Sequence, residues 1–353
     1  MQTGYAFLIA FAMALIITPM VRTFAKKVGA MVQPSSRSVH KIPVPHLGGI
    51  AIYVSSVVAM LLSGPLDTTA EIALIVGGFV ILAVGVIDDI YDLKPWQKAI
   101  GQVLSAGVVI ALGVSISFMT NPFSGVLNVL GVIAIPLTLI WVVSFENLVN
   151  FSDGLDGLAA GIVAVTATVI VFASYKAGAY GIPPAAAAIA GSVLGFLPYN
   201  FHPASIFMGD AGAMYLGLAL AVLSVQGLVK SAVFMSVLAP LLALMVPISD
   251  TAFAIIRRKF SGQSVSHADH DHLHHRLLEL GLGQKNAVLS IYLVTILGGV
   301  LGLISGFSPI ETGGPIAGLV VIVLFAAANR AGLLTISRKN GKSQADQSSG
   351  GQR

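Results

Sequence analysis

Four side chains with carboxamide or carboxylate groups recur at every third residue between two apolar runs. They are Asn147, Asn150, Asp153 and Asp156 in "SFENLVNFSDGLDGLAAG". A spacing of three keeps them roughly on one side of a helical or turn-like segment. One aspartate alone could simply cap the next helix. Four groups in register instead favour a site that binds a cation or a polar ligand, since oxygen donors of this kind suit Mg²⁺.

A second acidic group stands in "GVIDDIYDLKPWQKAIGQ", at the end of another apolar run. On a helix, Asp88 and Asp92 share a face, whereas Asp88 and Asp89 point in different directions. Lys94 and Lys98 follow closely. The group is either a solvated helix end or a site that holds Mg²⁺ or activates a nucleophile.

Two further motifs are rich in polar side chains. In "NFHPASIFMGDAGAMYLG", Asp210 directly precedes an apolar run, where the helix dipole favours a carboxylate in any case. "SHADHDHLHHRL", residues 266–277, is typical of either a transition-metal site or a surface that binds phosphates. The chain has no cysteine, so thiolate metal sites are excluded. We favour contact with phosphate and sugar.

The composition shows what positions these motifs. Hydrophobic residues make up 56% of the 353 residues and charged residues only 10%, against about 25% charged in soluble proteins. Membrane spans need about 20 apolar residues. The sequence predicts an all-α polytopic membrane protein of ten to eleven transmembrane helices around a cytoplasmic-side cleft. The predicted spans lie near residues 4–23, 47–64, 71–88, 99–118, 126–145, 157–175, 184–199, 211–229, 232–256, 287–306 and 314–333.

The distribution of charge predicts the orientation of these spans. If the first span starts outside, all Lys and Arg residues except Lys176 and Lys230 fall on the cytoplasmic side, as do all eight histidines. The motifs above lie on that side too. No Lys or Arg precedes Pro19, so a cleavable signal peptide is not expected. We expect one transmembrane catalytic domain over residues 1–335 and a disordered polar tail over 336–353.

Acids at the centre of one face and bases at its rim predict a Mg²⁺-diphosphate site at the edge of the bilayer. The bases would hold phosphates by charge-assisted hydrogen bonds. The two alternative classes of protein are a transporter and a histidine-based zinc enzyme. A transporter would place its polar groups near the bilayer midplane, often in inverted repeats, and neither is seen here. A histidine-based zinc enzyme would be separated from a Mg²⁺ enzyme by metal analysis.

The motifs also resemble a known family. "DDIYD", "NLVNFSDGLDGLAAG", "NFHPASIFMGDAG" and "HLHHRL" are similar to those of the polyprenyl-phosphate N-acetylhexosamine-1-phosphate transferases of glycosyltransferase family 4, in family order. The resemblance runs from about Arg37 to Leu278. It is greatest to bacterial undecaprenyl-phosphate GlcNAc-1-phosphate transferases. Enzymes that transfer phospho-MurNAc-pentapeptide have a differently worded histidine motif and a longer insert after the paired aspartates.

The resemblance implies that UDP-GlcNAc and undecaprenyl phosphate react to give GlcNAc-diphosphate-undecaprenol and UMP. The implied cofactor is Mg²⁺, with Mn²⁺ as a substitute. The product would start a surface polysaccharide such as a teichoic acid linkage unit or O-antigen. The implied setting is the bacterial plasma membrane with the site facing the cytoplasm. No nucleic-acid partner is expected, and a homodimer is compatible with the resemblance. The alternative is the same chemistry with UDP-GalNAc or UDP-MurNAc-pentapeptide.

The resemblance also assigns roles to individual residues. The implied catalytic residues are Asp88, Asp89, Asp153, Asp156, His272, His274, His275 and Arg276. The implied substrate-binding residues are Lys41, Lys98, Asn147 and Asn200, and the implied metal ligands are Asp210 and Asn150. Asp89 is the better candidate for activating the lipid phosphate. His46 departs from the family pattern, since many relatives carry Arg before the Gly-Gly pair.

Overall fold

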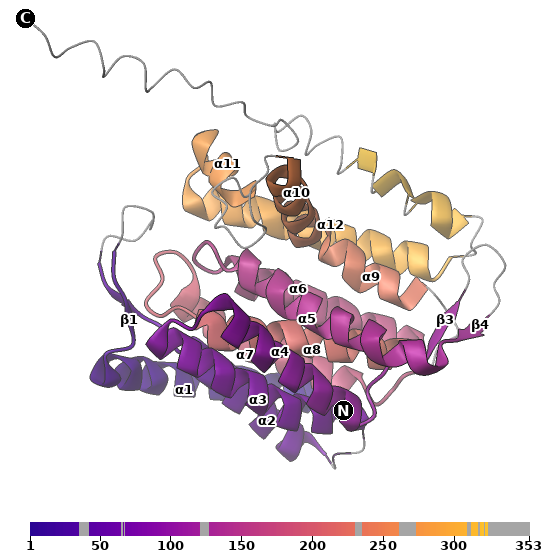
Figure 1. Cartoon of the computed structure of the whole chain (residues 1–353), viewed down its shortest axis with the longest axis horizontal. Helices are drawn as coiled ribbons and strands as arrows, with labels where there is room; N and C mark the ends of the chain where they lie inside the picture. Colours follow the sequence, from indigo (N-terminus) through magenta and orange to yellow (C-terminus); the bar gives the residue numbers. More distant parts are fainter. Residues whose placement is uncertain are drawn as a thin grey trace, which may run out of the picture.

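The computed structural model describes residues 1–34, 42–64, 66, 68–120, 127–229, 235–260, 273–308, 312–316, 318–320 and 322–323. Helices dominate it (Figure 1). They are α1 (Gln2–Val28), α2 (Gly48–Ser63), α3 (Thr69–Tyr91), α4 (Pro95–Ala111), α5 (Ala134–Ser152), α6 (Leu158–Lys176), α7 (Pro183–Asn200), α8 (Gly209–Val229), α9 (Met235–Ala243), α10 (Met245–Phe260), α11 (Leu273–Glu279) and α12 (Gln284–Gly306), with a short 3₁₀ turn η1 (Gly131–Ile133).

Two small antiparallel ribbons lie at opposite ends of the bundle (Figure 1). One pairs β1 (Met31–Val32) with β2 (Val44–Pro45), and the other pairs β3 (Phe118–Thr120) with β4 (Leu127–Val129). The second ribbon corrects two predicted spans, because α4 ends at Ala111 and α5 begins only at Ala134. Apolar composition alone does not separate a short strand from the end of a helix.

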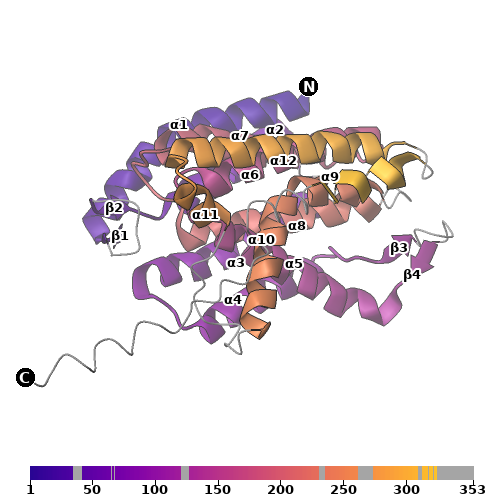
Figure 2. The same ribbon diagram turned by 90° about the horizontal axis from the view of Figure 1, so that it is seen from above.

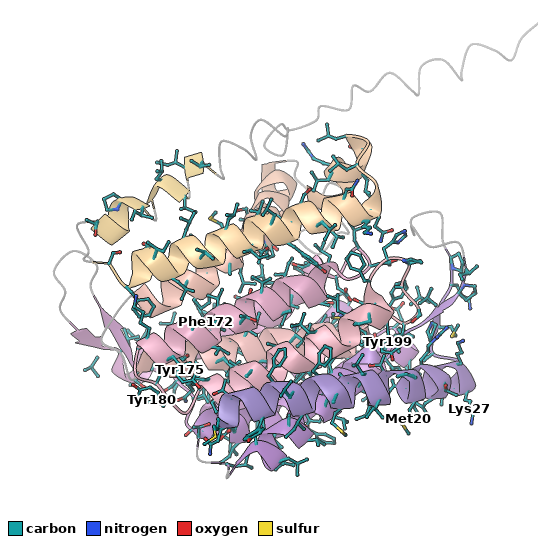
Figure 3. All side chains as sticks on the ribbon, turned by 180° about the vertical axis from the view of Figure 1, so that it is seen from behind. Met20, Lys27, Phe172, Tyr175, Tyr180 and Tyr199 are labelled. Carbon is teal, nitrogen blue, oxygen red and sulfur yellow. The ribbon has the colours of Figure 1, made fainter. Side chains whose placement is uncertain are left out.

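Three short connections and the β1–β2 ribbon place the ends of α1, α3, α5 and α7 beside the starts of the helices that follow them, α2, α4, α6 and α8. Figure 3 shows Lys27 and Tyr199 toward this end of the bundle, and Phe172, Tyr175 and Tyr180 at the other. The connections at the first end carry the acidic motifs.

Within the described residues, six helices are long and apolar enough to cross a membrane. They are α1, α3, α6, α8, α12 and α5 with its preceding 3₁₀ turn. This confirms an all-α membrane protein, while the count of ten to eleven spans stays a prediction. The predicted span 232–256 is wrong as one helix, because it breaks at Leu244 into α9 and α10, which point in different directions (Figure 2). Pro240 and Pro247 flank the break, and proline lacks the N–H that continues a helix.

Helix α8 forms the centre of the bundle. It packs against α2, α3, α5 and α6, and the side chains from Ala211 to Val225 are almost all fully buried. Small residues let backbones approach closely, as is common between membrane helices. A Cβ at Gly49 would lie 2.1 Å from the N of Gly212, and one at Gly85 would lie 2.3 Å from the Cα of Ala211. The start of α8 is therefore held in contact with α2 and α3.

Candidate active site

The N-terminus of α8 is capped by a side chain from another helix. Asp89, on the last turn of α3, accepts hydrogen bonds from the backbone N–H of Asp210 (2.8 Å) and of Ala211 (3.2 Å). An N-terminal helix turn leaves such N–H groups unpaired, and a carboxylate there also gains from the helix dipole. Gly209 has a left-handed φ of 72°, and a Cβ on it would lie 2.4 Å from Asp89 Oδ2. Glycine at this position lets Asp89 approach and so fixes Asp210.

Lys98 joins three of the predicted site residues. Its Nζ lies 2.8 Å from Asp88 Oδ2 and also contacts Asp210 Oδ2. With its carboxamide oriented to satisfy both neighbours, Asn150 donates to Asp210 Oδ1 (3.1 Å) and accepts from Lys98 Nζ (3.2 Å). The Asp210 side chain is 34% exposed, so this carboxylate remains accessible to a ligand. Residues from α3, α4, α5 and α8 thus meet at one point.

Asp88 also closes the end of α3. Its Oδ1 accepts the backbone N–H of Leu93 (2.9 Å), just after Asp92 adopts a left-handed φ of 52°. This turn leads directly into α4, which carries Lys98. The predicted pairing of Asp88 with Asp92 on one face does not appear in the site, because Asp92 terminates the helix.

His46 adds an imidazole next to Asp89. Its Nδ1 is 3.6 Å from Asp89 Oδ1, and burial lowers the pKa of its imidazole below the ordinary value. The loop around it is tied to the start of α8. Phe207 N–H donates to Pro45 O (2.9 Å), and Gly48 N–H donates to Phe207 O (3.0 Å). The start of α2 and the start of α8 are therefore held in register.

The charges of the cluster fit a divalent cation. Asp88 and Asp210 share the ammonium group of Lys98, and the carboxyl group of Asp89 lies beside them at the start of α8. The described residues contain no group of three His, Cys, Asp or Glu side chains that could hold a metal. The donor set is instead one accessible carboxylate, Asp210, with the carboxamide of Asn150 beside it. Mg²⁺ commonly uses one or two carboxylates together with substrate phosphates and water, so these residues fit it.

The motif of Asp153 and Asp156 lies beside this cluster. Asp156 Oδ2 is 2.9 Å from His202 Nδ1 and accepts the N–H of Ala204 (3.1 Å), which fixes the loop between α7 and α8. The pKa of Asp153 is raised to about 7, mainly by burial and then by the negative charges of Asp89 and Asp156. Asp153 is therefore held close to the cluster, whereas Asp156 contacts the loop that leads to Asp210.

The two asparagines predicted to bind substrate make internal contacts. Asn147 Nδ2 donates to Gln102 Oε1 (3.1 Å) and to Val143 O (2.8 Å). Asn200 is only 1% exposed, and its Nδ2 donates to Ile206 O (3.1 Å). Their contacts fix neighbouring helices and the loop before α8. Whether either also contacts substrate stays a prediction.

The remaining predicted residues are not placed at this cluster. Lys41 and His272 lie outside the described residues. His274 and His275 belong to α11, but their side chains fall outside the described part of the chain. Arg276 lies in the last turn of α11, which packs against α12.

Four side chains near the site were missed by the sequence reasoning: Gln102, Ser105, Glu146 and Tyr292. The Tyr292 hydroxyl donates to Gly157 O, and a Cβ at Gly161 would overlap the Tyr292 ring, so α12 packs directly on the motif of Asp153 and Asp156. Ser105 Oγ lies 2.8 Å from Glu146 Oε1, close to Asn147 on α5. Glu146 could have been noticed as a carboxyl group inside an apolar run. Gln102 follows Lys98 by one helical turn.

Several known proteins are similar to this chain in sequence. The family model "Glycosyl transferase family 4" matches residues 71–228. A probable undecaprenyl-phosphate N-acetylglucosaminyl 1-phosphate transferase of Bacillus subtilis is 42% identical over 289 residues, covering 82% of this chain and 81% of the relative. A decaprenyl-phosphate N-acetylglucosaminephosphotransferase of Mycolicibacterium smegmatis is 40% identical over 78% of this chain and 75% of its own length. A phospho-N-acetylmuramoyl-pentapeptide-transferase of Clostridioides difficile is 30% identical over 87% of this chain and 98% of its own length. The chain therefore belongs to glycosyl transferase family 4.

Proposed function

We propose that this protein transfers GlcNAc-1-phosphate from UDP-GlcNAc to a polyprenyl phosphate. The observation that carries the proposal is the cluster of Lys98, Asn150 and Asp210 beside Asp88 and Asp89, in a membrane chain whose relatives at 42% and 40% identity are named for this transfer. Undecaprenyl phosphate is the proposed acceptor. The proposed setting is a bacterial plasma membrane with the cluster facing the cytoplasm, supported by the bias of Lys and Arg toward that side.

In the proposed reaction, an oxygen of the lipid phosphate attacks the β-phosphorus of the UDP-sugar. A new phosphoanhydride bond forms, the bond from the β-phosphorus to the bridging oxygen breaks, and UMP leaves with that oxygen. Lys98 would neutralise phosphate oxygens through charge-assisted hydrogen bonds. The preorganised contacts among Lys98, Asn150 and Asp210 mean that little reorganisation is needed as charge develops.

Asp210 and Asn150 are the residues that would hold Mg²⁺, or Mn²⁺ in its place. Such a cation supplies charge neutralisation on the diphosphate when it is bound. The chain's own task is to keep the Asp210 carboxylate aimed at the accessible side. Asp89 does this through the first N–H groups of α8.

The geometry favours direct attack over an aspartyl-phosphate intermediate. Both oxygens of Asp89 accept backbone N–H groups of α8, and both oxygens of Asp88 are engaged by Leu93 and Lys98. These bonds draw charge away from the carboxylate oxygens and make each of them a weaker nucleophile. A phosphate monoester dianion already has a nucleophilic oxygen. Asp89 is accordingly proposed as a positioning residue, in place of its predicted role as the activator of the lipid phosphate.

The test uses the purified protein with undecaprenyl phosphate, Mg²⁺ and a panel of UDP-sugars, and follows UMP release. UDP-GlcNAc should be the preferred donor, and Asp210→Ala should abolish turnover without unfolding the protein. Preference for UDP-GalNAc or UDP-MurNAc-pentapeptide would make that compound the proposed donor in place of UDP-GlcNAc. No turnover with any donor would overturn it. A stoichiometric burst of UMP without lipid would overturn direct attack.

A further inference from the structure

Polar side chains continue from the cluster into the apolar part of the bundle in three layers. On α4 and α8 the contributing residues follow one helix face at spacings of three or four, and on α5 Asn147 and Glu146 lie three and four residues before Asn150. The layers, from the site inward, are Lys98–Asn150–Asp210, Gln102–Asn147–Met214 and Ser105–Glu146–Gly217. We refer to these three layers as the polar ladder.

The middle layer connects all three helices. Asn147 Nδ2 donates to Gln102 Oε1 (3.1 Å), and Gln102 Nε2 lies 3.7 Å from the sulfur of Met214. Gln102 is only 3% exposed. The carboxamides of Gln102 and Asn147 therefore fix each other's orientation one turn from Lys98 and Asn150.

The innermost layer contains a carboxyl group in an apolar environment. Glu146 is fully buried, and within the described part of the chain its Oε2 has no hydrogen-bond partner. Ser105 Oγ lies 2.8 Å from Glu146 Oε1 and 2.9 Å from Gln102 O. A hydroxyl has one hydrogen and a carbonyl only accepts. A carboxylate at Glu146 would have to share the one Ser105 hydrogen with Gln102 O, whereas a neutral Glu146 carboxylic acid that donates to Ser105 lets both contacts be full hydrogen bonds.

The position of Glu146 leaves little freedom for the surrounding backbones. A Cβ on Gly217 would lie 2.5 Å from the Cα of Glu146, so α5 and α8 touch at this layer. A carboxyl group inside a membrane helix is costly. Replacing a buried polar group by an apolar one of similar size is often neutral for stability. The fold alone would therefore be served equally well by leucine.

We propose that Glu146, with Ser105 and Gln102, is a positioning group for the transfer reaction. Its hydrogen bond to Ser105 sets the rotation of α5 against α4. Rotation of α4 would move Lys98 away from Asp210, and rotation of α5 would move Asn150 away from it, because Ser105 and Glu146 lie on the same helices as these two residues. The inference rests on the proposed function and adds residues to it that do not touch the cluster.

The experiment compares Glu146→Gln, Glu146→Leu and Ser105→Ala for UMP release and thermal unfolding in detergent. Glutamine keeps the shape and a donor toward Ser105, so its kcat should stay within about threefold of the wild-type value. Glu146→Leu should lower kcat about 10- to 100-fold, the scale of a misplacement of about 1 Å. Its KM for the UDP-sugar and its melting temperature should change little.

Ser192→Ala is the matched control. Ser192 is equally buried and its Oγ likewise donates to a carbonyl three residues earlier, that of Ile189 (2.9 Å), but it lies on α7, outside the ladder. Ser105→Ala should lower kcat at least threefold, and Ser192→Ala should not. Ser105→Ala also tests the proposal if Glu146→Leu does not fold.

Three results would overturn the inference. Wild-type kcat in both Glu146→Leu and Ser105→Ala would show that the ladder does not position the cluster. An equal loss in Glu146→Gln and Glu146→Leu would show that the carboxyl itself is required. Inactivity of the wild-type protein with every donor would refute the proposed function as well as this inference. An active wild-type protein with the unexpected variant results above would refute this inference alone.

Discussion

Gly49 is the position at which a single added methyl group should disturb the site most directly. It lies in the first turn of α2, and a Cβ there would come within 2.1 Å of the N and 2.4 Å of the Cα of Gly212. Both atoms belong to the backbone of α8, two residues beyond Asp210. No side-chain rotation can relieve the overlap, so the helices must separate.

The size of the effect follows from these distances. Real Cβ contacts essentially never fall below 3.0 Å, so in Gly49→Ala the two backbones must move apart by about 0.9 Å. Overpacking of this kind costs about 1–3 kcal/mol of stability. A displacement of about 1 Å at a reacting group can cost about 100-fold in rate. We expect Gly49→Ala to lower kcat about 10- to 100-fold and to lower the melting temperature.

The assay is UMP release together with thermal unfolding in detergent, with Gly107→Ala as the control. Gly107 lies on the exposed face of α4, and a Cβ there would meet no atom within 4 Å. Alanine at a helix interior is favoured over glycine by about 0.5–1 kcal/mol. The control should therefore keep wild-type kcat and lose no stability. Wild-type kcat in a destabilised Gly49→Ala would refute the idea that the α2–α8 contact fixes Asp210.

Three other predictions follow from individual contacts of the site. Lys98→Met should lower kcat/KM by about 100-fold, the usual effect of losing one charge-stabilising donor. Lys27→Met is the control, because Lys27 is exposed and lies toward the same end of the bundle, and it should leave kcat/KM unchanged. Similar kcat/KM values for the two variants would refute the role of Lys98. Burial lowers the pKa of the His46 imidazole in the folded protein below its ordinary value of 6.5. As the pH falls through 6.5, the unfolded chain binds the proton more readily than the folded one. The stability that His46 contributes is therefore complete above pH 6.5 and is lost as the pH falls. The melting temperature should accordingly fall less between pH 7 and pH 5 in His46→Asn than in the wild type, and parallel curves would contradict this. Asp156→Ala should lower the unfolding free energy by about 1–3 kcal/mol through lost hydrogen bonds to Ala204 and His202, and an unchanged melting temperature would argue against it.

The sequence predicted which residues meet better than it predicted what each one does. Its charge patterning placed Asp88, Asp89, Asn150 and Asp210 on one face, and the structure brings them together with Lys98. The role of Asp89 could not be predicted, because the N–H groups that it accepts belong to a helix far along the chain. Such a contact depends on tertiary packing and leaves no local pattern.

The elements were predicted where the apolar runs are long and bounded by polar loops. Errors arose where an apolar run changes its structure without changing its composition. Strand β4 (Leu127–Val129) lies inside the predicted span 126–145, α4 ends at Ala111 before the predicted limit of 118, and the run 232–256 breaks at Leu244. Glu146 was visible in the sequence, but its partner Ser105 on α4 could not be inferred from spacing.

The capping of α8 by Asp89 has a consequence for how the protein is made. The acceptor and the first N–H group of the cap are separated by 121 residues, and α4 to α7 lie between them in the chain. A ribosome delivers α3 to the membrane well before α8. Until α8 arrives, the Asp89 carboxylate lacks both of its backbone donors, and α8 in turn cannot complete its first turn without α3. The cluster around Asp210 therefore assembles only after the last of these helices has been inserted, and any fragment of the chain that ends before Gly209 carries the acidic motifs of α3 and α5 without their partner on α8.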